Sequence, residues 1–236
     1  MLKAILFDLD GTLLPMDQSA FAKIYFQKIA EHSCPLGYTP EQFMSGMKAG
    51  IAALVKNNGS RTGEEAFWEA FSAVCGRAIY EQQDHIAEFY KEKFDATRAV
   101  CGFNPEAATT VRRAKASGLR VILATNPLFP AVATEKRVRW AGLDPSEFEF
   151  CTTYENFGLC KPNPAYYTEI LRRAELTPDE CLMVGNDVTE DAVAGSKAGL
   201  RTFLITDCLL NGQNLDFSVY PNGSFADLNA YIDTLL

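Results

Sequence analysis

Short apolar runs alternate with amphipathic segments along most of the chain. The first run, Ala4 to Phe7, is followed at once by Asp8, Leu9, Asp10 and Gly11, which predicts a buried strand ending in a polar turn. Further strands are predicted at 119–124, 148–151, 181–185 and 201–206, with a possible short one at 217–220. Helical spacing fills the intervals, including 187–198, and a terminal helix is predicted from residue 227. Strands that alternate with helices form a parallel sheet covered on both faces, so we expect an α/β fold.

Residues 17–94 show helical spacing without any strand pattern. Four helices are predicted there, and two of them have clear starts, at Thr39-Pro40 and at the capping pattern of Thr62 and Glu65. This break in the alternation of strands and helices indicates a four-helix module over residues 16–95. It would be inserted into a core formed by residues 1–15 and 96–236.

Composition excludes several classes of function. The 236 residues include 22 Lys plus Arg against 30 Asp plus Glu, and this net charge of −8 argues against a nucleic-acid partner. Seven cysteines without a CxxC pair argue against a disulfide framework and a thiolate zinc site, and two histidines exclude a His-rich metal site. We expect a reducing, cytoplasmic location, because neither a signal-peptide pattern nor an apolar run of membrane-spanning length is present.

Polar residues that can take part in catalysis or ligand binding follow the predicted strands or lie in the neighbouring loops. They are Asp8 with Asp10, Thr125, Lys161, and Asp187 with Asp191. Taken singly, each has an ordinary interpretation as a turn residue, a helix cap or a solvated lysine. In an open parallel sheet, however, these loops meet at one edge, where ligands bind. We therefore interpret them as one site.

The spacing of Asp8 and Asp10 places both carboxylates on one face of an extended strand end, where like charges repel unless a cation or a shared proton intervenes. Oxygen-only, carboxylate-rich sites select Mg²⁺, which keeps several waters and usually binds one or two carboxylates plus phosphate oxygens. Asp187 can supply another carboxylate. Asp191, four residues later on the same helical face, can orient Lys161 or hold a metal-bound water.

Lys161 and Thr125 supply a positive charge and a hydroxyl donor, the groups that position a transferring phosphoryl group. A carboxylate nucleophile that forms an acyl phosphate is then the plausible covalent route. Asp8 would attack, and Asp10 would protonate the leaving alkoxide and then activate water. Gly11 permits close backbone approach, and the Asn126 amide also borders the phosphate position, so both are candidate phosphate-binding residues.

The chain closely resembles the phosphatase branch of the haloacid dehalogenase-like superfamily. The residues that carry the resemblance are Asp8-Leu9-Asp10-Gly11-Thr12, Thr125-Asn126, Lys161, and Gly185-Asn186-Asp187 followed by Asp191. They include all four family motifs in their usual order and span roughly residues 1–14 and 100–206. The helical module resembles the family's cap in position and helix content alone.

This resemblance implies a Rossmann-like, doubly wound core with a smaller all-helical cap domain. It implies Asp8 as nucleophile, Asp10 as general acid and base, and Thr125 and Lys161 as phosphate holders. The implied Mg²⁺ ligands are Asp8, the main-chain carbonyl of Asp10, and Asp187.

Two departures from common family patterns matter. Asn186 stands where many members have glycine directly before the metal-binding aspartate, so its side-chain oxygen can share the ligand role of Asp187. Asp10 separates the chain from the true dehalogenases, which lack that second acid, and this argues against halide chemistry.

Three functions are compatible with these residues. The leading one is a Mg²⁺-dependent phosphatase acting on a small phosphorylated metabolite, with the cap closing over it. A sugar-phosphate phosphomutase of the β-phosphoglucomutase type is the alternative, since the Ser60-Arg61 turn faintly resembles the mutase cap loop, although residues 21–23 hold no histidine where those mutases have one. A phosphorylatable signalling module is less compatible, because an insert of cap size suits a lid. We interpret Arg61 as solvated, and Trp68, with Phe67 and Phe71, as cap core.

Overall fold

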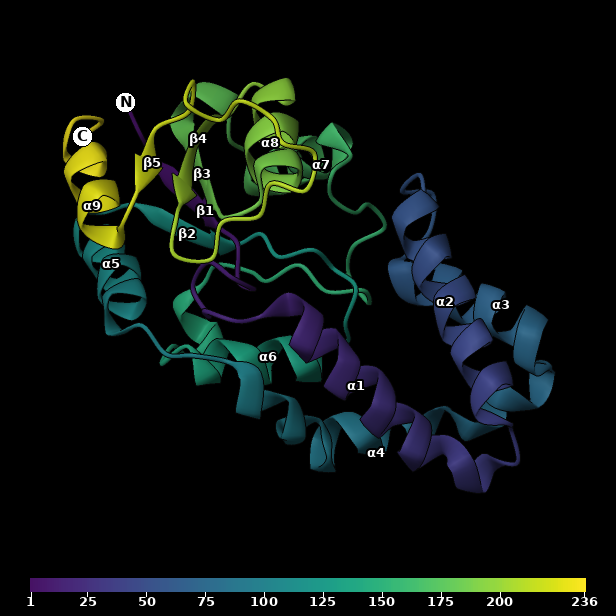
Figure 1. Cartoon of the computed structure of the whole chain (residues 1–236). Coiled ribbons are helices and arrows are strands. Elements are labelled where there is room, and N and C mark those ends of the chain that lie inside the picture. The colour runs from purple at the N-terminus through teal and green to yellow at the C-terminus, as the bar shows by residue number, and fades with distance from the viewer.

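A computed structural model describes residues 1–236 and contains one five-stranded parallel sheet with the strand order β2-β1-β3-β4-β5 (Figure 1). The strands are β1 (Ala4–Phe7), β2 (Arg120–Leu123), β3 (Cys181–Gly185), β4 (Arg201–Ile205) and β5 (Asn222–Gly223). Strand β1 lies between β2 and β3, with Phe7 opposite both Leu123 and Val184. The end of β1 therefore lies between the ends of its two neighbours.

Nine α-helices accompany the sheet. They are α1 (Gln18–Ser33), α2 (Pro40–Lys56), α3 (Gly63–Cys75), α4 (Gln83–Glu92), α5 (Pro105–Ala116), α6 (Ala131–Trp140), α7 (Pro164–Ala174), α8 (Ala194–Lys197) and α9 (Phe225–Asp233). None of them is both long and apolar enough to cross a membrane.

Alternate residues of the strands point to opposite faces of the sheet, and helices cover both faces. Ile5 and Phe7 join the larger core with residues of α5 and α9, whereas Ala4 and Leu6 pack in a second core with residues of α7 and α8. This period of two is what an extended strand imposes. The predicted α/β class with a doubly wound parallel sheet is confirmed.

The predicted helix starts are confirmed where capping chemistry marked them. Thr62 and Glu65 form a reciprocal capping box at α3, and the Thr39 side chain accepts a hydrogen bond from the Gln42 amide at α2. Asn104 and Asn163 cap α5 and α7, each followed by proline in the first turn. In each case a side-chain oxygen satisfies a backbone N–H group that has no partner within the helix.

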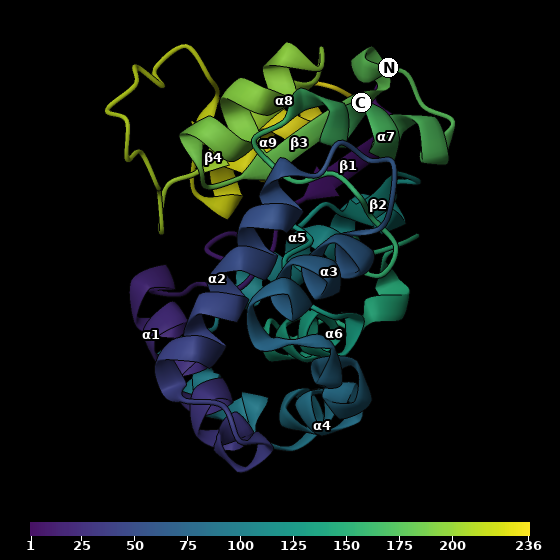
Figure 2. The ribbon, with the colours of Figure 1, turned by 90° about the vertical axis from the view of Figure 1, so that its right-hand side faces the viewer.

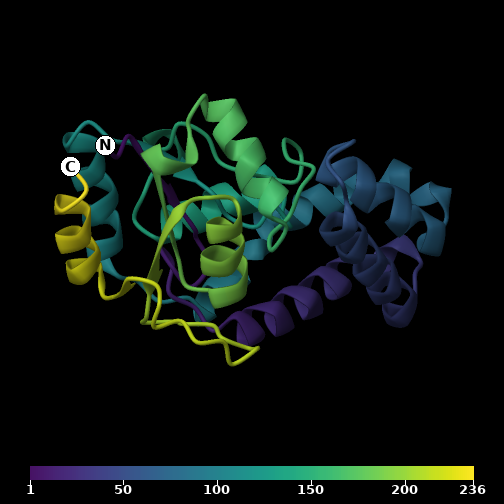
Figure 3. The same ribbon diagram turned by 90° about the horizontal axis from the view of Figure 1, so that it is seen from above.

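Helices α1–α4 form the predicted helical module. Helices α2 and α3 pack side by side as a hairpin (Figure 2), and α1 runs from the sheet region out to this hairpin (Figure 3). The hairpin also touches a core loop, because the amides of Gly63 and Glu64 donate to the carbonyls of Phe157 and Tyr154. The larger hydrophobic core is continuous across both parts of the chain. The domain boundaries at residues 15 and 95 stay a prediction.

The strand predicted over residues 148–151 is wrong, because only a single bridge joins Cys151 to Leu123 at the edge of the sheet. The main chain still bonds to β2 here, but one bond is out of register by one residue. The Leu123 amide donates to the Phe150 carbonyl and the Thr152 amide to the Leu123 carbonyl, whereas the Val121 carbonyl accepts from Glu149, so the regular parallel pattern holds only at Cys151.

Two further expectations near the C-terminus are corrected. Residues 217–220 form a turn in which the Asp216 carboxylate accepts from the Ser218 amide, and the last strand, β5, follows that turn. The terminal helix begins at Phe225 rather than at Asp227, because Ser224 caps it. The helix predicted over 187–198 is also divided: one π-helical segment, Val188–Val193, precedes the short α8.

Candidate active site

The predicted site residues come together at the carboxyl edge of the sheet. Asp8 follows β1, Thr125 follows β2, and Asp187 follows β3, while Lys161 lies in the loop before α7. Because these strands are adjacent and parallel, residues far apart in the sequence line one place, as the position of the loops predicts.

Lys161 lies between two carboxylates in the interior. Its Nζ donates to Asp8 Oδ1 at 2.8 Å and to Asp191 Oδ1 at 2.6 Å, and all three side chains are buried. Burial alone would lower the pKa of Lys161, but Asp191 and Asp8 together hold it well above its usual value. Burial raises the pKa of Asp8 to about 7, against the attraction of Lys161. Lys161 is thus a fixed positive charge beside the candidate nucleophile.

Asp191 organises the loop after β3. Its Oδ2 accepts hydrogen bonds from the amides of Asn186 and Asp187, at 3.0 and 2.9 Å. Gly185 permits this approach, since a Cβ atom there would lie 2.1 Å from the same oxygen. One carboxylate therefore positions both Lys161 and the backbone of the candidate metal ligand.

Asp187 caps the π-helical segment with one oxygen. Oδ1 accepts from the amides of Thr189 and Glu190, at 2.7 and 2.8 Å, and burial raises the pKa of Asp187 above its usual value. The capping leaves Oδ2 free of protein hydrogen bonds. A carboxylate oxygen in this position can serve a cation.

Asn186 links the loop after β1 to the chain near Cys208 through side-chain hydrogen bonds. Thr12 Oγ1 lies 3.0 Å from Asn186 Oδ1 and 3.1 Å from Asp8 Oδ2, and Asn186 Nδ2 donates to the Cys208 carbonyl at 2.7 Å. Gly11 packs on this amide with a φ of +88°, and a Cβ there would lie 2.3 Å from Asn186 Nδ2. The Asn186 oxygen thus faces a hydroxyl donor, which favours a supporting role over that of a ligand.

Thr125 and Asn126 present polar groups to the cavity. The Thr125 carbonyl is held from behind by the hydroxyls of Thr152 and Tyr166, at 2.6 and 2.8 Å. Asn126 Nδ2 donates to Glu190 Oε2 at 3.0 Å, while its Oδ1 is buried without a partner. The hydrogen bonds therefore fix this loop at the wall of the cavity that Asp8 also lines.

Asp10 is paired with a buried arginine that the sequence did not suggest. Arg137 on α6 is 0% exposed and donates to Asp10 Oδ2. Thr134 Oγ1 and the ring of Phe129 also contact the guanidinium. Asp10 Oδ1 is buried and has no hydrogen-bond partner. One oxygen of Asp10 is thus fixed and the other is available.

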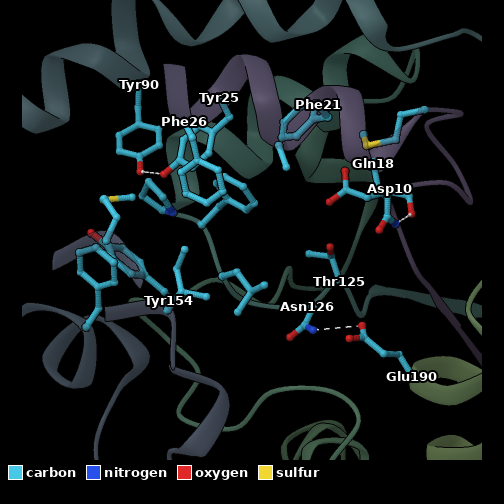
Figure 4. A pocket seen from close by; sticks show the side chains of 18 of the residues that line it. Asp10, Gln18, Phe21, Tyr25, Phe26, Tyr90, Thr125, Asn126, Tyr154 and Glu190 are labelled. Atoms are coloured by element: carbon cyan, nitrogen blue, oxygen red, sulfur yellow. Dashed lines mark hydrogen bonds between the residues drawn. The ribbon is translucent and has the colours of Figure 1, made fainter. Parts of the chain in front are cut away.

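A cavity of about 320 Å³ opens on these groups. Figure 4 shows Asp10, Thr125, Asn126 and Glu190 on one side of it and aromatic side chains on the other. Trp68, interpreted from the sequence as cap core, is buried and also lines this cavity. That interpretation is therefore incomplete, because the aromatic cap core is itself a wall of the site.

The donor set fits Mg²⁺. Five carboxylates line the cavity, and only Lys161 and Arg137 offset them. All the groups there that can reach a cation are oxygens, which Mg²⁺ prefers. Burial is the largest cause of the raised pKa of both Asp8 and Asp187, and the attraction of Lys161 opposes it.

Two residues of the site were not predicted from the sequence. Glu190 borders Asn126 in the cavity wall, and burial raises its pKa to about 7. Its position directly before Asp191 was the available signal. Arg137 had no such signal, because a charged residue in a helix usually faces solvent.

The remaining sequence candidates lie elsewhere. Arg61 pairs with Glu69 on the cap surface, outside the cavity. His32 and His85 stack on each other with ring centroids 4.2 Å apart, and each Nε2 lies within hydrogen-bonding distance of the other's carbonyl. This pairing is a structural link between α1 and α4.

Comparison with known proteins shows the family of this chain. A family model for haloacid dehalogenase-like hydrolases matches residues 2–199. The chain belongs to this family. A glyceraldehyde 3-phosphate phosphatase of Methanocaldococcus jannaschii is 29% identical over 87% of this chain and 85% of its own. A phosphoglycolate phosphatase of Nitrosospira multiformis is 30% identical over 93% and 88%.

Solved structures agree with the fold. A 2-haloacid dehalogenase from Pseudomonas syringae has a TM-score of 0.66 at 22% identity, with both chains fully covered. A phosphatase of the same family from Thermococcus onnurineus has a TM-score of 0.60 at 18% identity over 98% of both chains. Family and relatives together make the chain a hydrolase of the phosphatase kind within the haloacid dehalogenase-like family.

Proposed function

We propose that the chain is a Mg²⁺-dependent phosphatase that hydrolyses a small phosphorylated metabolite through a phosphoaspartyl intermediate on Asp8. The observation that carries the proposal is the buried arrangement of Asp8, Lys161 and Asp191 beside Asp10. Lys161 keeps positive charge next to the carboxylate that attacks. Asp10 lines the same cavity, and its Oδ1 has no hydrogen-bond partner in the protein.

The first step transfers the phosphoryl group to the enzyme. Asp8 attacks phosphorus, the bond to the leaving oxygen breaks, and that oxygen takes a proton from Asp10. Asp10 Oδ1 is the atom that carries this proton, because Arg137 occupies Oδ2. Lys161 and Thr125 would hold the phosphoryl oxygens in place, and the Asn126 side chain, whose Nδ2 donates to Glu190, borders them.

The second step returns the enzyme to its initial state. Water attacks phosphorus, gives its proton to Asp10 Oδ1, and breaks the phosphorus–oxygen bond to Asp8, which becomes a carboxylate again. Asp8 and Asp187, with the Asp10 carbonyl, would hold Mg²⁺, which offsets the negative charge of the phosphoryl group. Asp191 keeps Lys161 and the Asp187 backbone in register through both steps.

Hydrolysis is favoured over a mutase reaction by the position of the cap turn. The Ser60-Arg61 turn lines a separate surface hollow, and the Arg61 guanidinium is engaged by Glu69. Without a cap cation in the cavity, a sugar bisphosphate would find no partner for its second phosphate.

Phosphate release from a panel of monoesters tests the proposal, with MgCl₂ or with EDTA, for the wild type and Asp8→Asn. We expect release that needs Mg²⁺ and disappears in Asp8→Asn. Asp84→Asn, the same change on an exposed cap helix, is the matched control and should keep wild-type activity. Release in EDTA, or from Asp8→Asn at the wild-type rate, would refute the proposal.

A further inference from the structure

We infer that the substrate's leaving group is apolar, about one aromatic ring in size, and carries no second anionic charge. This inference rests on the phosphatase function proposed above and adds which monoesters the site selects. Three features of the cavity carry it: the composition of its wall, its charge and its size.

The wall opposite the carboxylates is aromatic. Nine aromatic side chains line the cavity, and Figure 4 shows several of them gathered on one side. Six that come from α1, from the other cap helices and from the loop before α7 are Phe21, Tyr25, Phe26, Trp68, Tyr90 and Tyr154. A polyol or an acyclic sugar placed against them would lose water without gaining hydrogen-bond partners, which is unfavourable.

Some polar atoms of this wall already form hydrogen bonds within the protein. The hydroxyls of Tyr25 and Tyr90 bond each other at 2.7 Å, so this pair has a single proton left to donate. The wall therefore recognises a ring by packing and aromatic geometry rather than by a network of hydrogen bonds.

The charge of the cavity excludes a second anion. Its lining includes five carboxylates, Asp8, Asp10, Asp187, Glu190 and Asp191, but no Lys, Arg or His. Arg137 lies behind this surface and is committed to Asp10. A carboxylate or a second phosphate on the leaving group would therefore lie among the apolar side chains of the opposite wall, where no cation compensates its charge.

The size of the cavity limits the leaving group. A dry apolar cavity of about 150 Å³ holds benzene, and the volume here is about 320 Å³. A phosphoryl group and one ring with a short linker fit within it, whereas a nucleotide with its base and sugar would extend beyond it. Phosphoglycolate and glyceraldehyde 3-phosphate, after which the relatives are named, would leave the aromatic wall unfilled.

Kinetics with matched alkyl phosphates test the inference. Phenylpropyl phosphate and propyl phosphate have leaving oxygens of similar basicity and differ in the ring alone. Burial of the ring predicts kcat/KM about 10- to 100-fold higher for phenylpropyl phosphate. Phosphoglycolate and glyceraldehyde 3-phosphate are expected to fall below it by at least the same factor.

Variants assign the preference to the wall. Phe26 is half-buried in the cavity wall, and Phe26→Ala should lower the phenylpropyl-to-propyl ratio of kcat/KM about 2- to 10-fold. Phe103→Ala is the matched control, because Phe103 is 60% exposed and lies outside the cavity. Ala22→Lys places a cation in the wall and should raise the ratio for phosphoglycolate over propyl phosphate, whereas Ala52→Lys on the exposed face of α2 should not.

Calorimetry with phosphonates, whose phosphorus–carbon bond resists hydrolysis, separates this inference from the proposed function. Tighter binding of phenylpropylphosphonate than of propylphosphonate, without phosphate release from any monoester, would support the aromatic subsite and refute the phosphatase proposal. Mg²⁺-dependent release with equal rates for both alkyl phosphates, or a preference for phosphoglycolate, would overturn the inference and leave the phosphatase proposal intact.

Discussion

The guanidinium of Arg137 on α6 holds one oxygen of Asp10, the candidate general acid and base that follows β1. Arg137 is itself held by Thr134 and by the ring of Phe129, and no part of it reaches solvent. The other guanidinium nitrogens donate to the Ala133 carbonyl and to Thr134 Oγ1, so the nitrogen that holds Asp10 Oδ2 has a fixed position. The geometry of the second acid thus depends on a helix more than a hundred residues away in the chain.

Arg137→Lys is expected to lower kcat about 10- to 100-fold, because lysine keeps the charge but loses the contacts with Ala133 and Thr134 that fix the nitrogen holding Asp10. Arg139→Lys, on the exposed side of the same helix, is the matched control and should behave as the wild type. Steady-state kinetics with a saturating substrate would measure the difference. An unchanged kcat in a folded Arg137→Lys protein would show that this pair does not position Asp10.

Local patterns predicted those parts of the fold whose determinants lie within a few residues of one another. Caps such as Thr62 with Glu65 and apolar runs such as Ala4 to Phe7 are of this kind. The strand predicted over 148–151 failed because Glu149 bonds to Val121 one residue out of register with the bridge at Cys151, a tertiary arrangement that no local pattern reports.

Some residues of the candidate site could likewise be predicted from local patterns, and others could not. Asp8, Thr125, Lys161 and Asp187 follow from the position of loops at the end of parallel strands and from the family motifs. Arg137 does not, because its contact with Asp10 depends on how α6 packs under the loop after β1. The aromatic wall was visible as apolar cap residues, but its orientation toward the carboxylates required the placement of α1–α4.

Gly185→Ala is expected to weaken Mg²⁺ binding about 10- to 100-fold, the usual cost of disturbing groups that support metal ligands. The new methyl group would displace Asp191, whose Oδ2 lies 2.1 Å from a Cβ at this position. Asp191 would then release the Asp187 amide and Lys161. Titration of the protein with Mg²⁺ measures the change.

The matched control for this substitution is Gly212→Ala, where nothing lies within 4 Å of the added methyl group. It should bind Mg²⁺ as the wild type does. Unweakened Mg²⁺ binding by Gly185→Ala would contradict the role assigned to Asp191.

The stability of the metal-free protein is expected to fall as the pH rises toward 8 because of Asp8. In the unfolded chain the pKa of an aspartate is about 4. In the folded chain burial raises the pKa of Asp8 to about 7. Between these values the folded state binds the extra proton. The free energy of unfolding therefore decreases with rising pH over this range.

Asp8→Asn removes that titration. In EDTA its Tm should exceed the wild-type Tm by several degrees at about pH 8, with a smaller difference at about pH 5. Mg²⁺ should raise the wild-type Tm most strongly at the higher pH, where Asp8 is ionised. Thermal unfolding across this range, with Asp84→Asn as the control, measures both effects, and a difference in Tm that is independent of pH would contradict the assignment.

The central claim is that the phosphoryl group passes through Asp8. Its most direct test is a rapid acid quench of the enzyme turning over a ³²P-labelled monoester with Mg²⁺, followed by peptide mapping of the labelled protein. The account predicts acid-stable, hydroxylamine-labile label on the peptide that contains Asp8, with both the formation and the loss of this label slower in Asp10→Asn, because Asp10 serves both steps. Turnover at the wild-type rate with no label on that peptide would contradict it.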